Sequence, residues 1–293
     1  MANTQSIGRR DVLQAAAAAA LTAATAATAA AQPGGRAVTK GRLKQSVSRW
    51  CYQKTVPSMP EFCKAVAGLG LTAIDLLDPP DWQVARDHGL ICSMGYGGGG
   101  SIRDGLNNPA NHDSIVTNLT AAMPKAAAMG VPNLITFFGN RMGRSDAEAI
   151  KNCVSALNRV KGPAEQHGVT ICGELLNSKV NHADYHGDRT PFGVEIVGAV
   201  NSPRVKLLYD IYHMQIMEGD VIRTIRQYQQ HIAHYHTGGV PGRNELDDTQ
   251  ELQWATVCRA IVDTGFTGYL AHEFVPKRDP LTSLREAVVL CDV

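Results

Sequence analysis

The chain has 293 residues, of which 44% are hydrophobic and 19% are charged, so it carries enough apolar material for a sizeable core. This composition excludes a disordered or fibrous protein. The 28 Lys and Arg residues nearly balance the 27 Asp and Glu residues, for a formal net charge of +1. A chain without excess positive charge is not expected to bind nucleic acid.

The first 31 residues are predicted to be a targeting segment. Arg9 and Arg10 precede an Ala- and Thr-rich stretch that ends at Ala31, just before Pro33. A charged start, an apolar middle and a small-residue end are typical of a signal peptide, and the segment 6–13 is similar to a twin-arginine export signal. The stretch is too rich in Ala and Thr for a transmembrane anchor, so we expect no stable membrane insertion.

The cysteines fit a protein that is exported after it has folded. Their number, seven, is odd, and no two of them form a Cys-x-x-Cys pair, so neither a disulfide framework nor a thiolate zinc site is expected. Unpaired thiols suit a chain that folds in the reducing cytoplasm and is exported intact. We therefore expect a signal peptide over residues 1–31, removed near Ala31, a mature tail over residues 32–42, and a periplasmic protein.

From residue 43 to residue 293, short apolar runs alternate with longer amphipathic segments, and no linker interrupts them. The predicted strands are 43–50, 73–76, 90–94, 133–137, 169–174, 205–210, 232–236 and 269–273. The predicted helices include 60–69, 112–129, 145–167, 251–264 and 281–291. Four of these helices precede or end at a glycine that is typical of a helix C-terminus, namely Gly70, Gly130, Gly168 and Gly265.

Eight strand–helix units in about 250 residues are the size of a (β/α)8 barrel, whereas a doubly wound sheet typically has fewer strands. We therefore predict an α/β fold, a single-domain (β/α)8 TIM barrel over residues 43–293. Gly95, Gly97 and Gly100 match the spacing of a dinucleotide-binding loop, but no helix begins at the last glycine. We predict that this segment is a mobile loop at the rim of the barrel.

Four consecutive predicted strands end in a residue that can ligate a metal, namely Glu174, Asp210, His236 and Glu273. The carboxyl ends of barrel strands form the active-site face, so these side chains are expected to meet. Three carboxylates and an imidazole in one place destabilise one another unless a cation neutralises them. Oxygen ligands with one nitrogen suit Mn²⁺, Mg²⁺ or Co²⁺, and Zn²⁺ is also open. Taken singly, Glu174 or Glu273 could instead pair with a loop Lys or Arg, and Asp210 could cap the next helix.

Further histidines lie beside this set. His234 is two residues before His236 and shares its inward face one layer deeper, so it either supports the metal site or is a core histidine with a hydrogen-bond partner. His272 is expected to point the opposite way, toward the helices, in a structural role. His182 and His186 lie in the loop after the fifth strand; they could touch substrate, but a solvated polar loop is the favoured interpretation.

The segment 209–219, Tyr-Asp-Ile-Tyr-His-Met-Gln-Ile-Met-Glu-Gly, resembles the corresponding segment of hydroxypyruvate isomerases. These enzymes belong to the xylose-isomerase-like superfamily of sugar isomerases and epimerases. The resemblance covers most of the second half of the chain and is only architectural over residues 43–140. Its other specific segments are 173–177, 234–236, 241–245 and 273–277.

The resemblance implies a role for each of six residues. Glu174, Asp210, His236 and Glu273 would ligate a divalent metal ion, and the two glutamates would also transfer protons from opposite sides of the substrate. His213 and Arg243 would hold substrate oxygens. A metal on a carbonyl and its neighbouring hydroxyl acidifies the carbon-bound proton and stabilises the enediolate that follows. Returning the proton to the neighbouring carbon isomerises hydroxypyruvate to tartronate semialdehyde, whereas returning it to the opposite face of the same carbon epimerises a sugar.

Two departures from the family pattern bear on the substrate. Hydroxypyruvate isomerases carry Gln at the position that matches His236, whereas the related keto-sugar epimerases carry His. The former also tend to place a His at the end of the third strand, where this chain has Met94, Gly95 and Tyr96. A keto-sugar 3-epimerase is therefore the alternative to a hydroxypyruvate-type isomerase.

Two further functions stay open on the same barrel. A metal-dependent endonuclease or other hydrolase would need several zinc ions and a basic groove, and the first three strand ends offer few ligands. An exported sugar-binding relative without turnover is disfavoured by the intact pair of Glu174 and Glu273. We expect a small-molecule hydroxy-carbonyl or sugar substrate as the partner, and the sequence leaves open whether the chain forms a homo-oligomer.

Overall fold

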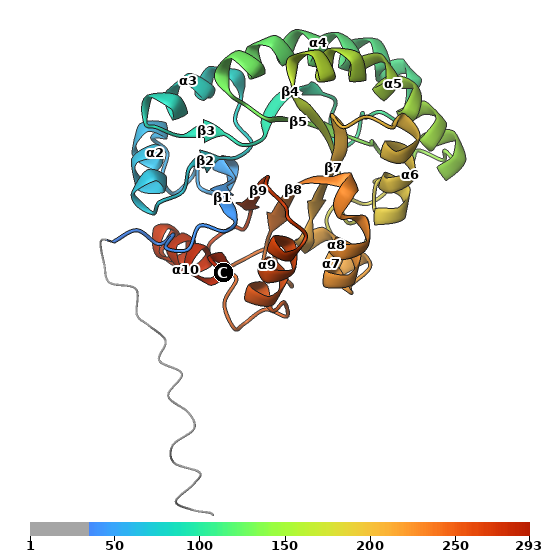
Figure 1. The fold of residues 1–293 in the computed structure, drawn as a ribbon. Helices are drawn as coiled ribbons and strands as arrows, with labels where there is room; N and C mark the ends of the chain where they lie inside the picture. Colours follow the sequence, from blue (N-terminus) through green and yellow to red (C-terminus); the bar gives the residue numbers. More distant parts are fainter. Residues whose placement is uncertain (1–34) are drawn as a thin grey trace, which may run out of the picture. The chain divides into compact units, whose positions relative to one another are not determined.

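Parallel strands on the inside and helices on the outside alternate along the chain in the computed structural model (Figure 1). The structure describes residues 35–293, and Arg36–Val293 form one unit. This unit is the predicted α/β barrel. The predicted signal peptide, residues 1–31, lies outside the described residues.

Seven strands form one parallel sheet in the order β1-β9-β8-β7-β6-β5-β4, and β2 and β3 form a separate parallel pair. Single bridges from Ser48 to Asp75 and from Leu77 to Gly95 join this pair to the two edges of the sheet. The pair therefore closes the curled sheet into a barrel. The strand bounds are Lys44–Val47 (β1), Ala73–Ile74 (β2), Ile91–Cys92 (β3), Gly95–Gly99 (β4), Asn133–Phe137 (β5), Thr170–Glu174 (β6), Val205–Asp210 (β7), Ile232–Thr237 (β8) and Tyr269–His272 (β9).

The helices surround the strands, and their ends follow from the local sequence. Ser58 and Ser145 each accept a hydrogen bond from a backbone N–H three residues on, at the start of α2 and α5. Gly130 and Gly168 adopt φ of 72° and 69° at the ends of α4 and α5, as predicted. The α-helix bounds are Met59–Gly68 (α2), Pro79–Asp87 (α3), His112–Met129 (α4), Asp146–His167 (α5), Thr190–Val200 (α6), Ile211–Met217 (α7), Val221–Tyr228 (α8), Trp254–Asp263 (α9) and Pro280–Cys291 (α10).

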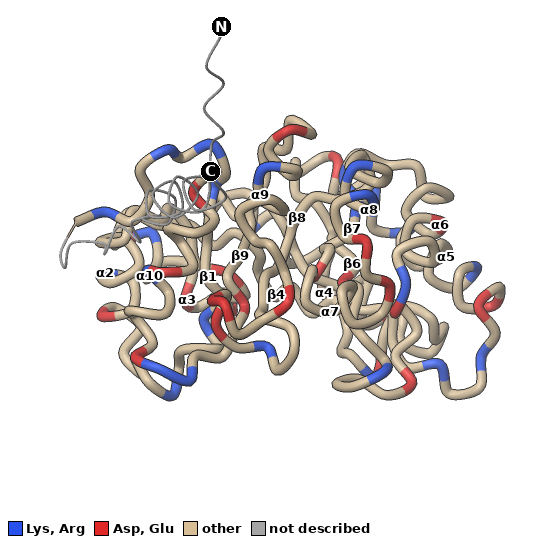
Figure 2. The backbone as a smooth tube through the Cα atoms, turned by 90° about the horizontal axis from the view of Figure 1, so that it is seen from below, with Lys and Arg blue, Asp and Glu red and all other residues tan. Residues whose placement is uncertain are grey.

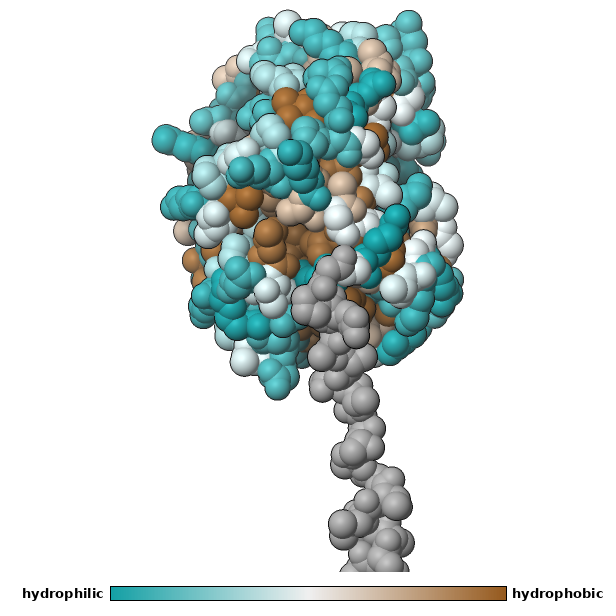
Figure 3. All heavy atoms as spheres, turned by 90° about the vertical axis from the view of Figure 1, so that its left-hand side faces the viewer, coloured by the Kyte–Doolittle hydropathy of each residue, from teal (hydrophilic) through white to brown (hydrophobic). Residues whose placement is uncertain are grey.

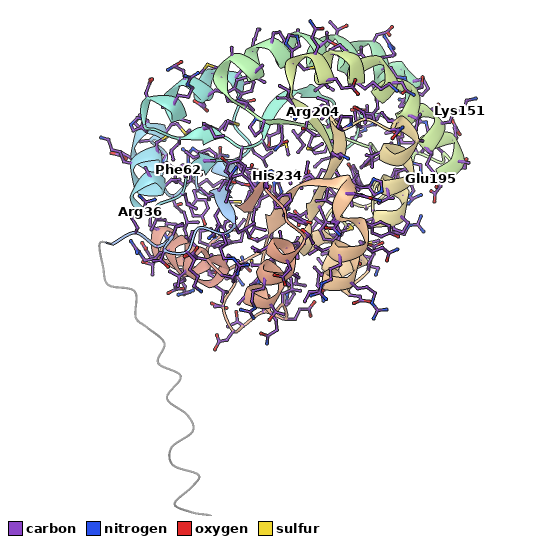
Figure 4. All side chains as sticks on the ribbon, in the orientation of Figure 1. Arg36, Phe62, Lys151, Glu195, Arg204 and His234 are labelled. Atoms are coloured by element: carbon purple, nitrogen blue, oxygen red, sulfur yellow. The ribbon has the colours of Figure 1, made fainter. Side chains whose placement is uncertain are left out.

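Apolar side chains fill the barrel below its polar mouth. A small interior cluster is separate from the main core between strands and helices, and it consists of Leu76, Met94, Ile135, Cys172 and Leu208. Alternate strand residues share a face, so Glu174 and Asp210 come directly above Cys172 and Leu208. Figure 4 shows His234 inside the ring of strands, whereas Lys151 and Glu195 lie on the outer helices α5 and α6. The inward face thus changes from apolar to polar toward the carboxyl ends of the strands.

The glycine-rich segment after β3 is not the predicted rim loop, because Gly95–Gly99 is strand β4 and pairs with β5. Neighbouring groups come too close to this strand for larger side chains. A Cβ at Gly99 would collide with the carbonyl oxygen of Ile135, and one at Gly95 would lie 2.7 Å from the ring of Trp82. The prediction was wrong because close approach of neighbouring groups and a flexible loop both favour glycine.

The start of the described unit is fastened to its end by Asp292. The Asp292 carboxylate accepts hydrogen bonds from the backbone N–H groups of Thr39, Lys40 and Gly41 at 2.6, 2.7 and 2.8 Å. Burial raises the pKa of Asp292, but these N–H groups lower it further, so the pKa lies below its usual value. The carboxylate therefore stays ionised and holds residues 39–41 against the end of α10.

All seven cysteines are free and buried in the described unit. Burial raises the pKa of Cys92, Cys153 and Cys172 to well above the ordinary value for a thiol. These thiols are therefore protonated at neutral pH.

The surface of the barrel carries both signs of charge. Figure 2 shows Lys and Arg interspersed with Asp and Glu along the backbone rather than gathered by sign. The face in Figure 3 has hydrophobic residues near its middle, with hydrophilic residues around them. Among the residues that the structure describes, no helix has the length and hydropathy needed to cross a membrane.

Candidate active site

The four metal ligands predicted from the sequence lie together at the carboxyl ends of β6 to β9. Glu174 and Asp210 end β6 and β7, His236 is the next-to-last residue of β8, and Glu273 directly follows β9. One ligand atom from each lies within 4.8 Å of the other three, and all four residues are buried. The register of the sheet brings neighbouring ligands to the same level, since Asp210 on β7 pairs directly with His236 on β8.

His236 Nδ1 is the centre of this cluster. It lies 2.7 Å from Glu273 Oε2, 3.5 Å from Glu174 Oε1 and 3.8 Å from Asp210 Oδ2. It is buried, yet it makes no hydrogen bond of good geometry. Three carboxylates thus surround one nitrogen whose hydrogen-bonding capacity is unused.

The crowded acids perturb one another. Burial raises the pKa of Asp210 to about 7, and the charges of Glu273 and Glu174 add to this effect while Arg243 opposes it. Burial also raises the pKa of Glu174. Burial raises the pKa of Glu273 too, but Arg243 and His236 lower it further, to well below its usual value. Burial lowers the pKa of His236, whereas Glu273 and the other acids raise it well above normal. The cluster therefore needs added positive charge for all its acids to be ionised.

These four residues fit a divalent cation. They offer three carboxylates and one imidazole nitrogen, with ligand atoms close enough to share one ion. The unused Nδ1 of His236 supplies a nitrogen ligand once its proton is lost. An oxygen-rich set of this kind suits Mn²⁺, Mg²⁺ or Co²⁺.

Arg243 and Trp50 hold the Glu273 carboxylate from the open side. Arg243 Nη2 forms an ion pair with Glu273 Oε2 and lies 3.2 Å from Asp210 Oδ2. Trp50 Nε1 donates a hydrogen bond to Glu273 Oε1 at 2.6 Å, and the Arg243 guanidinium lies over the Trp50 ring at 5.3 Å. Sequence reasoning missed Trp50, although the predicted first strand 43–50 ends at it, because only strand ends with metal-ligating side chains were considered. In the structure β1 ends at Val47, and Trp50 lies in the short 3-10 helix Arg49–Cys51.

His213 lies behind the cluster rather than in its opening. Its Nδ1 accepts a hydrogen bond from the backbone N–H of Asn177 at 3.1 Å. Its Nε2 lies 3.2 Å from Arg243 Nη1 and 3.6 Å from Asp210 Oδ2. Asp210 also accepts a hydrogen bond from the backbone N–H of His213, so it caps α7 as well as facing the cluster. The predicted contact of His213 with substrate oxygens stays a prediction.

Asp75 lies below the cluster, directly after β2. Its Oδ2 accepts a hydrogen bond from His236 Nε2 at 2.9 Å, and its Oδ1 lies 3.0 Å from His234 Nε2. His234 is thus part of the supporting layer, one of the two roles that its spacing allowed. Sequence reasoning missed Asp75, although a lone charged residue in the apolar run 73–77 was a signal for it.

A cavity of about 280 Å³ opens onto the cluster. Glu174, Glu273 and Arg243 form its polar side. The remaining lining is mostly apolar or aromatic and consists of Trp50, Leu76, Tyr96, Ile102, Ile135, Phe137, Leu176 and His182. The two glutamates therefore face one cavity.

The other histidines differ in position. His182 lines the cavity, in keeping with the substrate contact left open for it rather than with the favoured solvated loop. His186 is buried, and its Nε2 lies 3.1 Å from Asp146 Oδ1, so it ties the loop after β6 to the start of α5. His272 is buried beside Gln45 at 2.8 Å, and burial lowers its pKa to about 3, in keeping with a structural role.

A larger hollow of about 580 Å³ lies at the opposite end of the strands, beside Lys44, Asn133 and Arg204. No Asp, Glu, His or Cys is among the described residues that line it. It therefore lacks the acid–base groups found at the smaller cavity.

Comparison with known proteins gives consistent matches. A family model described as xylose isomerase-like TIM barrel matches residues 63–290. A human protein described as a putative hydroxypyruvate isomerase is 25% identical over 240 residues, which are 80% of each chain.

Two solved structures share the fold. A Brucella melitensis structure described as AP endonuclease, family 2, matches with a TM-score of 0.75 at 21% identity, over 83% of this chain and 97% of that chain. The 3-keto-D-glucoside 4-epimerase of Escherichia coli matches with a TM-score of 0.71 at 16% identity, over 85% of this chain and 98% of that chain.

Proposed function

Since the chain belongs to the xylose isomerase-like TIM barrel family, we propose that it is a divalent-metal-dependent isomerase of a small hydroxy-carbonyl compound, of the type that interconverts hydroxypyruvate and tartronate semialdehyde. The observation that carries this proposal is the meeting of Glu174, Asp210, His236 and Glu273 at one buried point beside a cavity. The similarity to the human putative hydroxypyruvate isomerase supports the same chemistry.

The residues of the chain provide the parts that such a reaction needs. When bound, a divalent cation supplies positive charge that stabilises the negative charge developing on the substrate oxygens. Glu174 and Glu273 both line the cavity. One carboxylate takes the proton from the carbon next to the carbonyl, which leaves an enediolate, and a carboxylate returns a proton to the neighbouring carbon.

The two glutamates are held differently, which suits a division of labour in proton transfer. Glu273 receives hydrogen bonds from Trp50 and Arg243, which favour its ionised form. Among the described residues, Glu174 has no such side-chain donors beyond its contact with His236 at 3.5 Å, and its pKa is raised by burial. Two carboxylates in unlike surroundings are a common arrangement for a base and an acid.

A keto-sugar epimerase is the second candidate, and the lining of the cavity favours it. Arg243 is the only Lys or Arg among the described lining residues, and it is already paired with Glu273 and Asp210. The carboxylate of hydroxypyruvate would therefore meet no unpaired cationic side chain. Burying an unpaired carboxylate is unfavourable, and an uncharged ketose has no carboxylate to bury.

Deuterium uptake in D₂O tests the proposal and separates the two substrate classes. The protein would be loaded in turn with Mn²⁺, Mg²⁺, Co²⁺ or Zn²⁺ and incubated with hydroxypyruvate, tartronate semialdehyde or common ketoses. After removal of protein and ion, proton NMR should show deuterium beside the carbonyl of one class only. Absence of uptake with every ion, or uptake that a chelator does not stop, would contradict the proposal.

We also propose that residues 1–31 direct export to the periplasm as a folded protein. The paired arginines Arg9 and Arg10 and the small-residue end of the segment support it. The burial of every cysteine in the described unit agrees with a chain that is folded before it meets an oxidising compartment.

A further inference from the structure

Asp75 occupies a buried position at the point where the barrel closes. Its backbone forms the bridge to Ser48 that joins β2 to the edge of the main sheet. Its side chain is fully buried beneath the four-residue cluster. A buried carboxylate is costly unless it is well supplied with hydrogen-bond donors, so its partners indicate what it does.

The polar partners of Asp75 come from the ends of β1 and β3 and from β8, and the first of them is Ser48 Oγ, after β1, which donates to Oδ2 at 3.5 Å. Ser93 Oγ, after β3, donates to Oδ1 at 2.5 Å, and His236 Nε2, from β8, donates to Oδ2 at 2.9 Å. His234 Nε2 lies 3.0 Å from Oδ1, although it makes no hydrogen bond of good geometry. The best-aligned imidazole partner of Asp75 is therefore His236, which is also the nitrogen ligand of the cluster.

This contact fixes which nitrogen of His236 carries hydrogen. An ionised carboxylate only accepts hydrogen bonds, so Nε2 must be the protonated nitrogen. The other nitrogen, Nδ1, then keeps its lone pair when the ring is neutral, and it points at Glu174, Asp210 and Glu273. Carboxylates that bind the far nitrogen of a metal-ligating histidine have this effect on the ring.

We propose that Asp75 is a positioning residue that holds the His236 ring in its Nε2–H tautomer and aims Nδ1 at the metal. This inference rests on the proposed function, because it concerns the ion that the cluster would bind. Asp75 acts through His236 and does not touch the substrate. His234 shares the buried layer but makes no contact with the three acids that would shape metal affinity.

An alternative occupant of this layer is a second cation. Asp75, His234 and His236 have ligand atoms within 4.8 Å of one another, so they could in principle share an ion. The two carboxylate oxygens of Asp75 already accept hydrogen bonds from Ser93 Oγ and His236 Nε2. These O–H and N–H groups occupy the positions that a second cation would need. The number of ions bound per chain distinguishes the two arrangements.

Nitrogen-15 NMR of the histidine rings tests the tautomer directly in the wild-type protein. The protein would be labelled at histidine and loaded with Zn²⁺, which is diamagnetic, and His236→Gln would identify the His236 signals. We expect Nε2 to show the shift of a protonated nitrogen and Nδ1 that of a metal-bound nitrogen. A protonated Nδ1, or two Zn²⁺ ions per chain with Nε2 unprotonated, would overturn the proposal.

Variants test the effect on metal binding. Asp75→Asn should weaken Mn²⁺ binding, measured by the paramagnetic resonance of free Mn²⁺, by about 10- to 100-fold, and should abolish the uniform Nε2–H tautomer. The matched control Asp188→Asn makes the same change at another buried acid, which pairs with Arg141 at 3.0 Å, and should change Mn²⁺ affinity less than about threefold on the same scale. Equal affinities of Asp75→Asn and wild type would contradict the proposal.

Circular dichroism of each variant would accompany these titrations. If Asp75→Asn does not fold, the wild-type NMR experiment decides the question by itself. Failure of the proposed function has a different signature, because wild-type protein would then bind no divalent ion or show no deuterium uptake. Failure of the present inference leaves both intact and changes only the tautomer or the ranking of the two variants.

Discussion

Trp50 donates its indole N–H to Glu273 Oε1 at 2.6 Å, which links the turn after β1 to the residue that follows β9. This bond stabilises the ionised carboxylate and fixes its direction toward the cavity. The two residues come from opposite ends of the chain, so the bond depends on closure of the barrel.

Trp50→Phe is expected to impair turnover more than binding. A hydrogen bond to a charged group contributes about 1.5 kcal/mol, so kcat should fall roughly 10-fold while KM changes little. Steady-state kinetics on the substrate found by deuterium uptake would measure both. Val275→Ala, at a 40% exposed residue close by in sequence, should leave kcat unchanged. A similar loss in both variants would remove the assigned role of Trp50.

Glu174→Gln and Glu273→Gln should each abolish deuterium exchange into the substrate while the fold is kept. Glutamine has nearly the same size but cannot take up a proton, and the metal content of each variant separates loss of proton transfer from loss of the ion. NMR in D₂O measures exchange, and circular dichroism checks the fold. Exchange at the wild-type rate in either variant would show that the residue concerned is not a proton-transfer group.

Asp210→Ala should lose the metal ion. The substitution removes one of three carboxylates and leaves His236 Nδ1 with fewer acidic neighbours. Elemental analysis after dialysis should find about one ion per wild-type chain and far less in the variant. Asp188→Asn changes another buried acid, which pairs with Arg141 at 3.0 Å, and it should retain the ion. Full occupancy of Asp210→Ala would exclude Asp210 as a ligand.

Asp292→Asn should destabilise the barrel in a pH-dependent manner. The folded-state pKa of Asp292 lies below its ordinary value, so its contribution is present above about pH 4, the unfolded pKa, and is lost as the pH falls through the folded pKa. Urea unfolding near pH 7 should show a loss of about 1–3 kcal/mol, which shrinks toward pH 3. Asp113→Asn, at a side chain that is 92% exposed, should change little at any pH.

Replacing Arg9 and Arg10 by lysine should block export. Twin-arginine signals are read by a receptor that requires the arginine pair, so charge alone is not enough. Fractionation of cells that express the full chain should place the wild type in the periplasm and the double variant in the cytoplasm. Arg36→Lys, outside the predicted signal, serves as the control. Periplasmic accumulation of the double variant would argue against this route.

The barrel was predictable because its signals are local. Strands β5 and β7 and helix α4 have the predicted bounds, since each is an apolar run or amphipathic segment with clear ends. The meeting of Glu174, Asp210, His236 and Glu273 was also predictable, because polar residues at consecutive strand ends of a barrel must face the same mouth. The glycine-rich strand β4 was not predicted. Its glycines are required by the close approach of neighbouring groups, and the local sequence does not show these groups.

Asp75 and Trp50 were missed for a different reason. Asp75 stands inside an apolar run, and its partner His236 is 161 positions away in sequence. Trp50 lies in a short turn after β1, and its partner Glu273 is 223 positions away. Both roles depend on contacts made only when the barrel closes, and no periodicity in the chain records such contacts.

The enclosure of all seven cysteines has a practical consequence for where this protein can work. Oxidants and thiol–disulfide exchange enzymes act on thiolates that they can reach. The folded barrel presents them with no exposed thiol among its described residues, so it needs no oxidative maturation and offers no site for mispaired crosslinks. Its activity should be the same in reducing and oxidising surroundings.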